Sequence, residues 1–325
     1  MLDRRIPDMV TVQSAVTMAL RAPSAHNAQP WSWRTGHSRL HLFAEPDRWL
    51  PQVDPDGRDL VLGCGATLHH LRLGFATFGW AAEVHRVPDA GSPDHLAIVS
   101  LRRAEPSDDE IVLAAAIPHR RTDRRRHGAW PVPGGYLDEL GKAAAGEGAQ
   151  LHVVADPARR RLASAIAKTA WRHAGASVPG PVPAQRTASG LPAAGGSTRA
   201  GSSVRTRPAT AGASPDGDAT VLLVLSTAGD DLQSRLRAGE AMSAVLLRAT
   251  SLGLSSCPLT EPLLLDGVRK TVEDLVADGG APHLVLRVGW APANAEPLPA
   301  SPRRSLADVL QPLEAPSKYH HPVSG

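Results

Sequence analysis

The chain has 325 residues, of which 42% are hydrophobic, and a formal net charge of +3. This length allows a large core in one or two domains, and no run reaches the roughly 18 apolar residues of a membrane span, so we expect a soluble, cytoplasmic protein. Its two cysteines are too few for a disulfide framework or a cysteine-rich metal site.

Hydrophobic periodicity predicts alternating helices and strands in the first third of the chain. Residues 8–21 have the pattern of an amphipathic helix, which ends before Pro23. The elements expected after it are a strand over Leu40–Phe43, a long helix over 58–79, and strands over Ala81–Val87 and His95–Leu101.

The remainder of the chain begins with a capping box and continues the alternation. Ser107 and Glu110 have the spacing at which side chains and backbone bond reciprocally, so a helix should run from there to Ile117. From Arg172 to Pro215 there is no Asp, Glu or aromatic residue, so we expect a flexible insert that buries too little apolar area to become ordered. The other expected elements are helices over 134–145, 157–172 and 230–252 and strands over Leu151–Ala155, Thr220–Ser226 and 283–289.

Two of the long predicted helices carry matching glycines. Gly65 and Gly79 are 14 residues apart, as are Gly239 and Gly253, and a strand anchored by a proline follows in each half. An internal duplication would explain both the match and the chain length, and a chance match is the alternative.

A polar loop over residues 23–31, here the 23–31 loop, is the most informative motif. Pro23 ends the first helix, and Ser24, Asn27 and Gln29 supply short polar or amide side chains. Such a loop can hydrogen-bond the edge of a heteroaromatic ring. The alternative is a structural turn into a strand, with the two tryptophans that follow packed in the core.

A basic run over His119–His127, here the 119–127 loop, is the second motif. Its arginine forks and the hydroxyl of Thr122 suit a phosphate monoester. The alternatives are a solvated loop and a nucleic-acid surface. The second is disfavoured because the net charge is small and no aromatic residues interleave with the run.

Other candidate motifs do not carry chemistry. The run Gly63–Gly65 lacks the third glycine of a dinucleotide fingerprint. The pairs His69-His70 and His320-His321 lack a third ligand at metal-site spacing, so we interpret them as core or surface residues. Cys257 has no evident histidine partner, and we interpret it as a loop residue.

Taken in order, these motifs make the chain resemble the nitroreductase-like FMN flavoprotein superfamily, and within it the Acg-type NAD(P)H nitroreductases of actinobacteria. The resemblance covers nearly the whole chain except about 172–217. The segments that carry it are Ala22–Trp31, Asp54–Arg58, Arg120–Arg125, Trp130–Gly135, Gly253–Pro262, Leu286–Pro292 and Pro302–Arg304.

The resemblance implies an α+β, nitroreductase-like fold with two tandem half-repeats, each a central sheet flanked by helices, that form a single-chain pseudo-dimer. One flavin site is then expected between the halves. The expected division is a first half over 1–106 that carries the flavin-ring loop, a second half over 107–171 and 218–325 that binds the phosphate, and an insert over 172–217 in the place of a lid.

The positions that match the family's motifs indicate which residues of this chain the resemblance implies as FMN contacts. The residues implied to line the ring are Pro23, Ser24, Ala25, His26, Asn27 and Gln29. Those implied to hold the phosphate are Arg120, Thr122, Arg124, Arg303 and Arg304, and those near the flavin N5 edge are Pro258, Leu259, Thr260 and Glu261. No catalytic side chain and no metal are expected, because the cofactor carries the chemistry.

The function implied is an FMN-dependent oxidoreductase that passes hydride from NADH or NADPH through flavin N5 to nitroaromatic or quinone-like acceptors. The alternative is a protein that stores or sequesters FMN with little turnover, and a third reading is a basic interaction module centred on the 119–127 loop. The expected partner is a small-molecule acceptor, without nucleic acid or membrane. The expected state is a monomer with an internal pseudo-dimer, or a weak homodimer.

Overall fold

The computed structural model describes residues 6–36, 39–156, 158–164, 166, 219–276 and 279–313. The predicted insert over 172–217 lies outside these residues. The predicted helix over 157–172 lies mostly outside them too, although residues 158–164 are helical. None of the described helices is long and apolar enough to cross a membrane.

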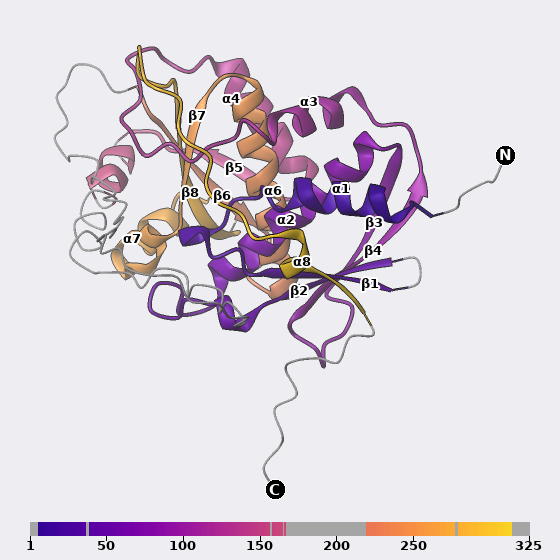
Figure 1. Cartoon of the computed structure of the whole chain (residues 1–325). Coiled ribbons are helices and arrows are strands. Elements are labelled where there is room, and N and C mark those ends of the chain that lie inside the picture. The colour runs from indigo at the N-terminus through magenta and orange to yellow at the C-terminus, as the bar shows by residue number, and fades with distance from the viewer. Residues whose placement is uncertain are drawn as a thin grey trace, which may run out of the picture.

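The first half is an antiparallel sheet with helices packed on one face (Figure 1). Strand β2 alternates between buried and more exposed residues, as expected when a single face meets the core. All the elements predicted in this half are confirmed, and β1 is added to them. The elements are α1 (Met9–Ala19), β1 (Trp31–Gly36), β2 (Arg39–Ala44), α2 (Arg58–Thr77), β3 (Trp80–Arg86) and β4 (His95–Arg103). Helix α3 (Asp108–Ala116), whose predicted capping box is present, follows this half and packs against both α2 and α6.

The second half repeats this arrangement, and its central strands β6 and β8 are buried along most of their length. The helix α7 packs beside β8 and the short turn over Glu261–Leu264. The elements are α4 (Gly134–Gly146), β5 (Gln150–Val153), β6 (Val221–Thr227), α6 (Leu232–Ser251), β7 (Ser255–Leu259), α7 (Asp266–Glu273), β8 (Ala281–Gly289), α8 (Leu306–Val309) and β9 (Leu310–Pro312).

The interpretation of Cys257 as a loop residue is wrong. It lies at the middle of β7, where it pairs with Arg287 of β8. The run Ser255–Leu259 contains Pro258, which lacks a backbone donor and argues against a strand inside a sheet. Strand β7 is at the edge of its sheet, so the missing donor disrupts no pairing on the outer side.

The two halves have the same topology, which confirms the single-chain pseudo-dimer. Each runs helix, strand, strand, long helix, strand, strand, and the sheet orders β3-β4-β2-β1 and β7-β8-β6-β5 correspond strand by strand. The long helices α2 and α6 have 20 residues each. They lie side by side between the two sheets (Figure 1).

The matching glycines of the sequence meet where these helices cross. A Cβ atom placed on Gly65 would lie 2.8 Å from Gly239 Cα, and one placed on Gly239 would lie 2.9 Å from Gly65 Cα. Each would also overlap a backbone carbonyl of the opposite helix. The duplicated position therefore requires glycine in both copies, because the two backbones approach too closely for any side chain.

Residues 290–313, here the C-terminal arm, leave the second sheet and cross to the first (Figure 1). There β9 pairs in parallel with β1, in the register Trp33 with Leu310. The arm continues from β8 of the second half, yet its strand belongs to the first sheet. It thereby brings residues from the end of the chain to the 23–31 loop.

Candidate functional site

The 23–31 loop has an unusual backbone. His26, Asn27 and Gln29 have positive φ angles of 50°, 56° and 50°. Non-glycine residues in this region cost on the order of 1 kcal/mol each, so the surroundings must hold them there. One restraint is internal, because Ser24 Oγ accepts a hydrogen bond of 2.9 Å from the Gln29 amide. Three positive φ angles in four residues orient the backbone N–H and C=O groups of this loop differently from those of an ordinary turn.

A pocket opens between the 23–31 loop and the residues that precede and begin α2. Its lining includes Ser24, Ala25 and Pro30 of the loop and Asp59 of the helix. The helix passes close to the loop at Gly63, where an added Cβ would lie 3.3 Å from Ser24 Cβ. Of the predicted ring-binding residues, Ser24, Ala25 and His26 therefore line a small pocket, whereas Pro23, Asn27 and Gln29 are not part of its lining.

Asp59 links this pocket to the predicted segment 258–261. Thr260 Oγ1 donates a 2.9 Å hydrogen bond to Asp59 Oδ2. Burial, together with the charge of Asp54 and to a lesser degree that of Glu261, raises the pKa of Asp59 to about 8. The carboxyl group is therefore mostly protonated at neutral pH and adds a hydrogen-bond donor to the pocket lining.

Four arginines meet beyond the 23–31 loop, and we call them the arginine cluster. They are Arg21 after α1, Arg120 and Arg121 of the 119–127 loop, and Arg303 of the C-terminal arm. Within the described ranges no carboxylate lies within ion-pair distance of them, and the Nε atom of each is buried without a partner. Burial and the neighbouring guanidiniums lower the pKa of Arg120 to about 9 and that of Arg303 to about 10. Buried like charges without counter-charges point to a bound anion.

The cluster is joined directly to the 23–31 loop. Arg303 Nη1 donates a 3.0 Å hydrogen bond to Asn27 Oδ1, and its Nη2 donates to the Arg21 carbonyl oxygen at 3.1 Å. Asn27 Nδ2 in turn donates to the Pro302 carbonyl oxygen at 3.1 Å. The predicted ring loop and the predicted phosphate residues thus form one continuous surface.

The 119–127 loop is held against the start of β7. Thr122 forms a bridge with Ser256, and the Asp123 amide donates to the Ser256 carbonyl oxygen at 2.9 Å. Asp123 also forms an ion pair with Arg125 at 2.8 Å. This anchoring brings the Thr122 hydroxyl to 3.5 Å from Arg120 Nη1, on the side of the cluster.

Two of the predicted phosphate residues lie elsewhere. Arg304 forms a two-pronged ion pair with Glu45, with contacts of 2.9 and 3.0 Å, and also donates to the Gln29 and Trp31 carbonyl oxygens. Its donors are therefore used in fixing the C-terminal arm to the first half. Arg124 is exposed, outside the cluster.

Three residues in or beside the arginine cluster were not among the site residues predicted from the sequence. Arg21 and Arg121 belong to the cluster, although they stand beside predicted motif residues. His70 is fully buried in α2, and its Nε2 has no partner among the described residues. The interpretation of His69-His70 as core residues is correct for both.

The described residues contain no group of three His, Cys, Asp or Glu side chains that could hold a metal ion.

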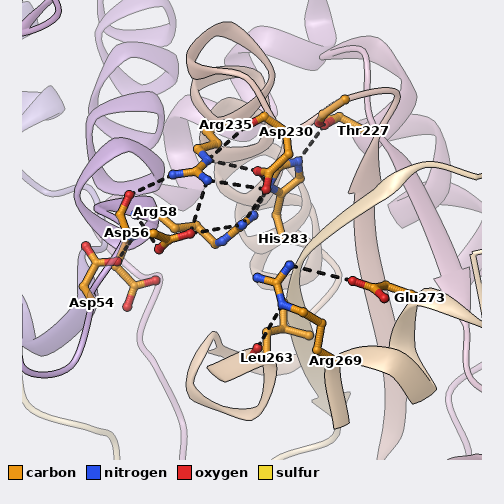
Figure 2. Close-up of polar contacts among 12 residues, drawn as sticks. Asp54, Asp56, Arg58, Thr227, Asp230, Arg235, Leu263, Arg269, Glu273 and His283 are labelled. Carbon is orange, nitrogen blue, oxygen red and sulfur yellow. Dashed lines mark hydrogen bonds and ion pairs between the residues drawn. The ribbon is translucent and has the colours of Figure 1, made fainter. Parts of the chain in front are cut away.

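A second charged network fixes the beginning of α2 beside the pocket (Figure 2). Arg58 lies 2.9 Å from His283 Nδ1 and 2.8 Å from Asp230 Oδ2. Thr227 Oγ1 donates to the Gly229 carbonyl oxygen and so accepts from His283 Nε2 at 2.6 Å. His283 is therefore neutral with its proton on Nε2, and burial with the charge of Arg58 lowers its pKa to about 4. The network ties the first half to β6, α6 and β8 of the second.

Curated relatives of the chain include two NAD(P)H nitroreductases, named as putative, from Mycobacterium tuberculosis strain H37Rv, and no family model matches. "Putative NAD(P)H nitroreductase Rv3131" is 42% identical over 326 residues, which cover 95% of this chain and 94% of that protein. "Putative NAD(P)H nitroreductase acg" is 36% identical over 323 residues, which cover 94% and 98% respectively.

Solved structures give more distant matches. A nitroreductase with bound FMN from Bacteroides fragilis is 17% identical, with a TM-score of 0.38, over 59% of this chain and 95% of that one. The FMN-dependent nitroreductase NfnB from Mycobacterium smegmatis, in complex with NADPH, is 17% identical, with a TM-score of 0.39, over 62% and 97%.

Proposed function

Because the chain belongs to the family of these mycobacterial NAD(P)H nitroreductases, we propose that it is an FMN-dependent oxidoreductase that takes electrons from NADH or NADPH. One observation carries the assignment of the cofactor. The arginine cluster is a largely buried positive site that meets no carboxylate among the described residues, and it adjoins a strained polar loop beside a pocket. A phosphate monoester attached to a flat heteroaromatic ring fits both parts.

The residues present suit the two ends of FMN. Arg120, Arg303 and Thr122 would hold the phosphate, since guanidinium forks and a hydroxyl match its oxygens. Helix α2 runs from Asp59 at the pocket to His70 near the cluster. At 1.5 Å per residue, the distance between these two residues along the helix axis is about 16 Å. That span accommodates a ribityl chain between the phosphate and the ring.

The ring would lie against the 23–31 loop and the segment over Pro258, Leu259, Thr260 and Glu261. When bound, FMN supplies the hydride chemistry. The chain's own residues bind and orient it, and the buried network at Arg58 holds α2 in place. Asp59 holds a carboxyl proton in the pocket, where it can donate a hydrogen bond to an acceptor oxygen. We propose nitroaromatic or quinone-like acceptors, whose oxygens suit such a donor.

We also propose that the protein acts as a monomer with one FMN site. Its first half would be residues 1–106, and its second half residues 107–171 together with 218–325. The close packing of α2 on α6 supports this proposal, because it occurs within one chain. Light scattering coupled to size-exclusion chromatography tests it, and a stable dimer would contradict it.

An anaerobic absorbance spectrum of the purified protein, repeated after adding NADH or NADPH, tests the activity. A flavin spectrum that bleaches is the expected result. Flavin that stays oxidised with both donors would instead support the storage alternative. A protein that binds no FMN, even after incubation with it, would overturn the proposal.

The double variant Arg120→Ala/Arg303→Ala tests the assignment of the phosphate site. We expect loss of FMN retention with a near-native far-UV circular dichroism spectrum, since no ion pair is broken. Arg126→Ala is the matched control, because this arginine belongs to the same loop but is exposed. Full flavin occupancy in the double variant would contradict the assignment.

A further inference from the structure

His70 has one ring nitrogen whose role is fixed by its neighbours. Its Nδ1 lies 3.0 Å from the Ala66 carbonyl oxygen and 2.9 Å from Ser243 Oγ. A carbonyl oxygen only accepts, so Nδ1 carries a proton. In the neutral ring Nε2 then has a lone pair, and it is buried without a partner within the described part of the chain.

The charged side chains that act on the His70 ring are arginines. Burial lowers its pKa well below the ordinary value, and His69, Arg120 and Arg303 lower it further, whereas the bond to Ala66 raises it. These groups come from three separate elements, namely α2, the 119–127 loop and the C-terminal arm. A second proton on the imidazole is therefore unfavourable while the cluster is empty.

On the side of α6, a chain of polar groups leads away from His70 to a carboxylate. Ser243 Oγ lies 2.9 Å from His69 Nδ1, and His69 Nε2 lies 3.7 Å from Glu147 Oε1. Glu147 is itself paired with Arg72 at 2.6 Å. Glu147 thus faces His69 rather than His70, so it does not stabilise a charge on His70 directly.

We propose that His70 is a fifth anion-binding residue of the arginine cluster and takes up a proton when a phosphate monoester dianion binds there. The inference rests on the proposed function and adds a residue and a proton to its phosphate site. The dianion offsets part of the positive charge around His70 and offers an acceptor oxygen, so a proton from solvent becomes favourable on Nε2. The resulting N–H then donates a charge-assisted hydrogen bond to a phosphate oxygen.

The sign of the pH dependence follows from linkage. A group that gains a proton on binding makes the complex more stable as the pH falls. The FMN phosphate is a dianion above its second pKa of about 6. Between roughly pH 6.5 and pH 7.5, below the pKa values of Asp59 and Arg120, affinity should therefore rise on acidification, by up to about tenfold per pH unit where only the complex is protonated. Riboflavin, which lacks the phosphate, should show no such dependence in this range, whereas a contribution from Asp59 at higher pH would appear with riboflavin as well.

Calorimetric titration of the flavin-free full-length protein with FMN at about pH 7.5, in two buffers of different ionisation enthalpy, measures the protons exchanged. We expect an uptake of about one proton per FMN. His70→Gln keeps a polar side chain but cannot be protonated, so the uptake should vanish and the affinity should become nearly independent of pH. His85→Gln, at an exposed position of β3, is the matched control.

The outcomes separate this inference from the proposed function. Failure of the unchanged protein to bind FMN contradicts the proposed function itself. FMN binding without proton uptake overturns the inference alone, and this measurement requires no variant. Uptake that persists in a folded His70→Gln variant but disappears in His69→Gln also overturns it, because the proton would then reside on His69.

Discussion

Asp59 shows how the fold sets the protonation state of one residue in the pocket. Its pKa is raised to about 8, so the folded chain keeps the proton across a range where the unfolded chain, with a pKa near 4, has released it. Linkage then requires the free energy of unfolding to fall as the pH rises from about 4 to about 8. Part of the stability is given up to hold a protonated acid beside the 23–31 loop.

We therefore expect Asp59→Asn to be more stable than the unchanged protein by about 1–3 kcal/mol at pH 8, with the difference shrinking toward zero at pH 4. Urea unfolding at the two pH values measures this. Asp138→Asn, at an exposed position of α4, is the control and should change stability little at either pH. An equal effect of Asp59→Asn at both pH values would contradict the raised pKa.

At the same scale, the sequence predicts some site residues and cannot predict others. Asn27 and Arg120 stand in motifs whose residue types suit a ring edge and a phosphate, and the structure joins them through Arg303. Arg303 and Arg304 are neighbours with the same chemistry, yet one enters the cluster and the other binds Glu45. Only the path of the C-terminal arm decides between them, and no local pattern encodes that path.

Among the elements, the pair of helices α2 and α6 depends on the glycines at its crossing. Gly65→Ala would push a methyl group into the backbone of α6, so the helices must separate. We expect a loss of about 3 kcal/mol or more, at the upper end of overpacking effects. Thermal or urea unfolding measures it.

The control for this prediction is a glycine in the interior of another helix. Gly141 of α4 has open space where a Cβ would stand. Gly141→Ala should therefore stabilise the protein by roughly 0.5–1 kcal/mol, through helix propensity alone. A similar small gain from Gly65→Ala would show that the two helices do not pack as closely as described.

Elements were predictable where hydrophobic periodicity is long, as in α2 and α6. The edge strand β7 was not, because five residues that include Pro258 resemble a loop, and only the position of the strand in the sheet makes the proline acceptable. Strand β9 was missed for a related reason. It has three residues, and it exists because the arm crosses to an open edge of the first sheet.

For the whole molecule, three of the contacts between the two halves show how the long helices and the crossing arm join them. The helices meet at the glycine crossing, Arg58 pairs with Asp230 and His283, and Arg304 pairs with Glu45. Each contact joins residues far apart in the sequence, and the long helix of each half loses its packing partner if the other half unfolds. The chain should therefore unfold as one cooperative unit rather than as two domains.

Hydrogen exchange tests this cooperativity in the full-length protein. Amides in β2 report on the first sheet and amides in β8 on the second, and we expect both sets to exchange with the same opening free energy. Gly65→Ala changes only a residue of the first half, but it should lower protection in β2 and β8 equally, because the crossing supports both sheets. If β2 loses protection while β8 keeps it, the halves unfold independently, and the internal pairing of α2 and α6 is only a contact between two domains.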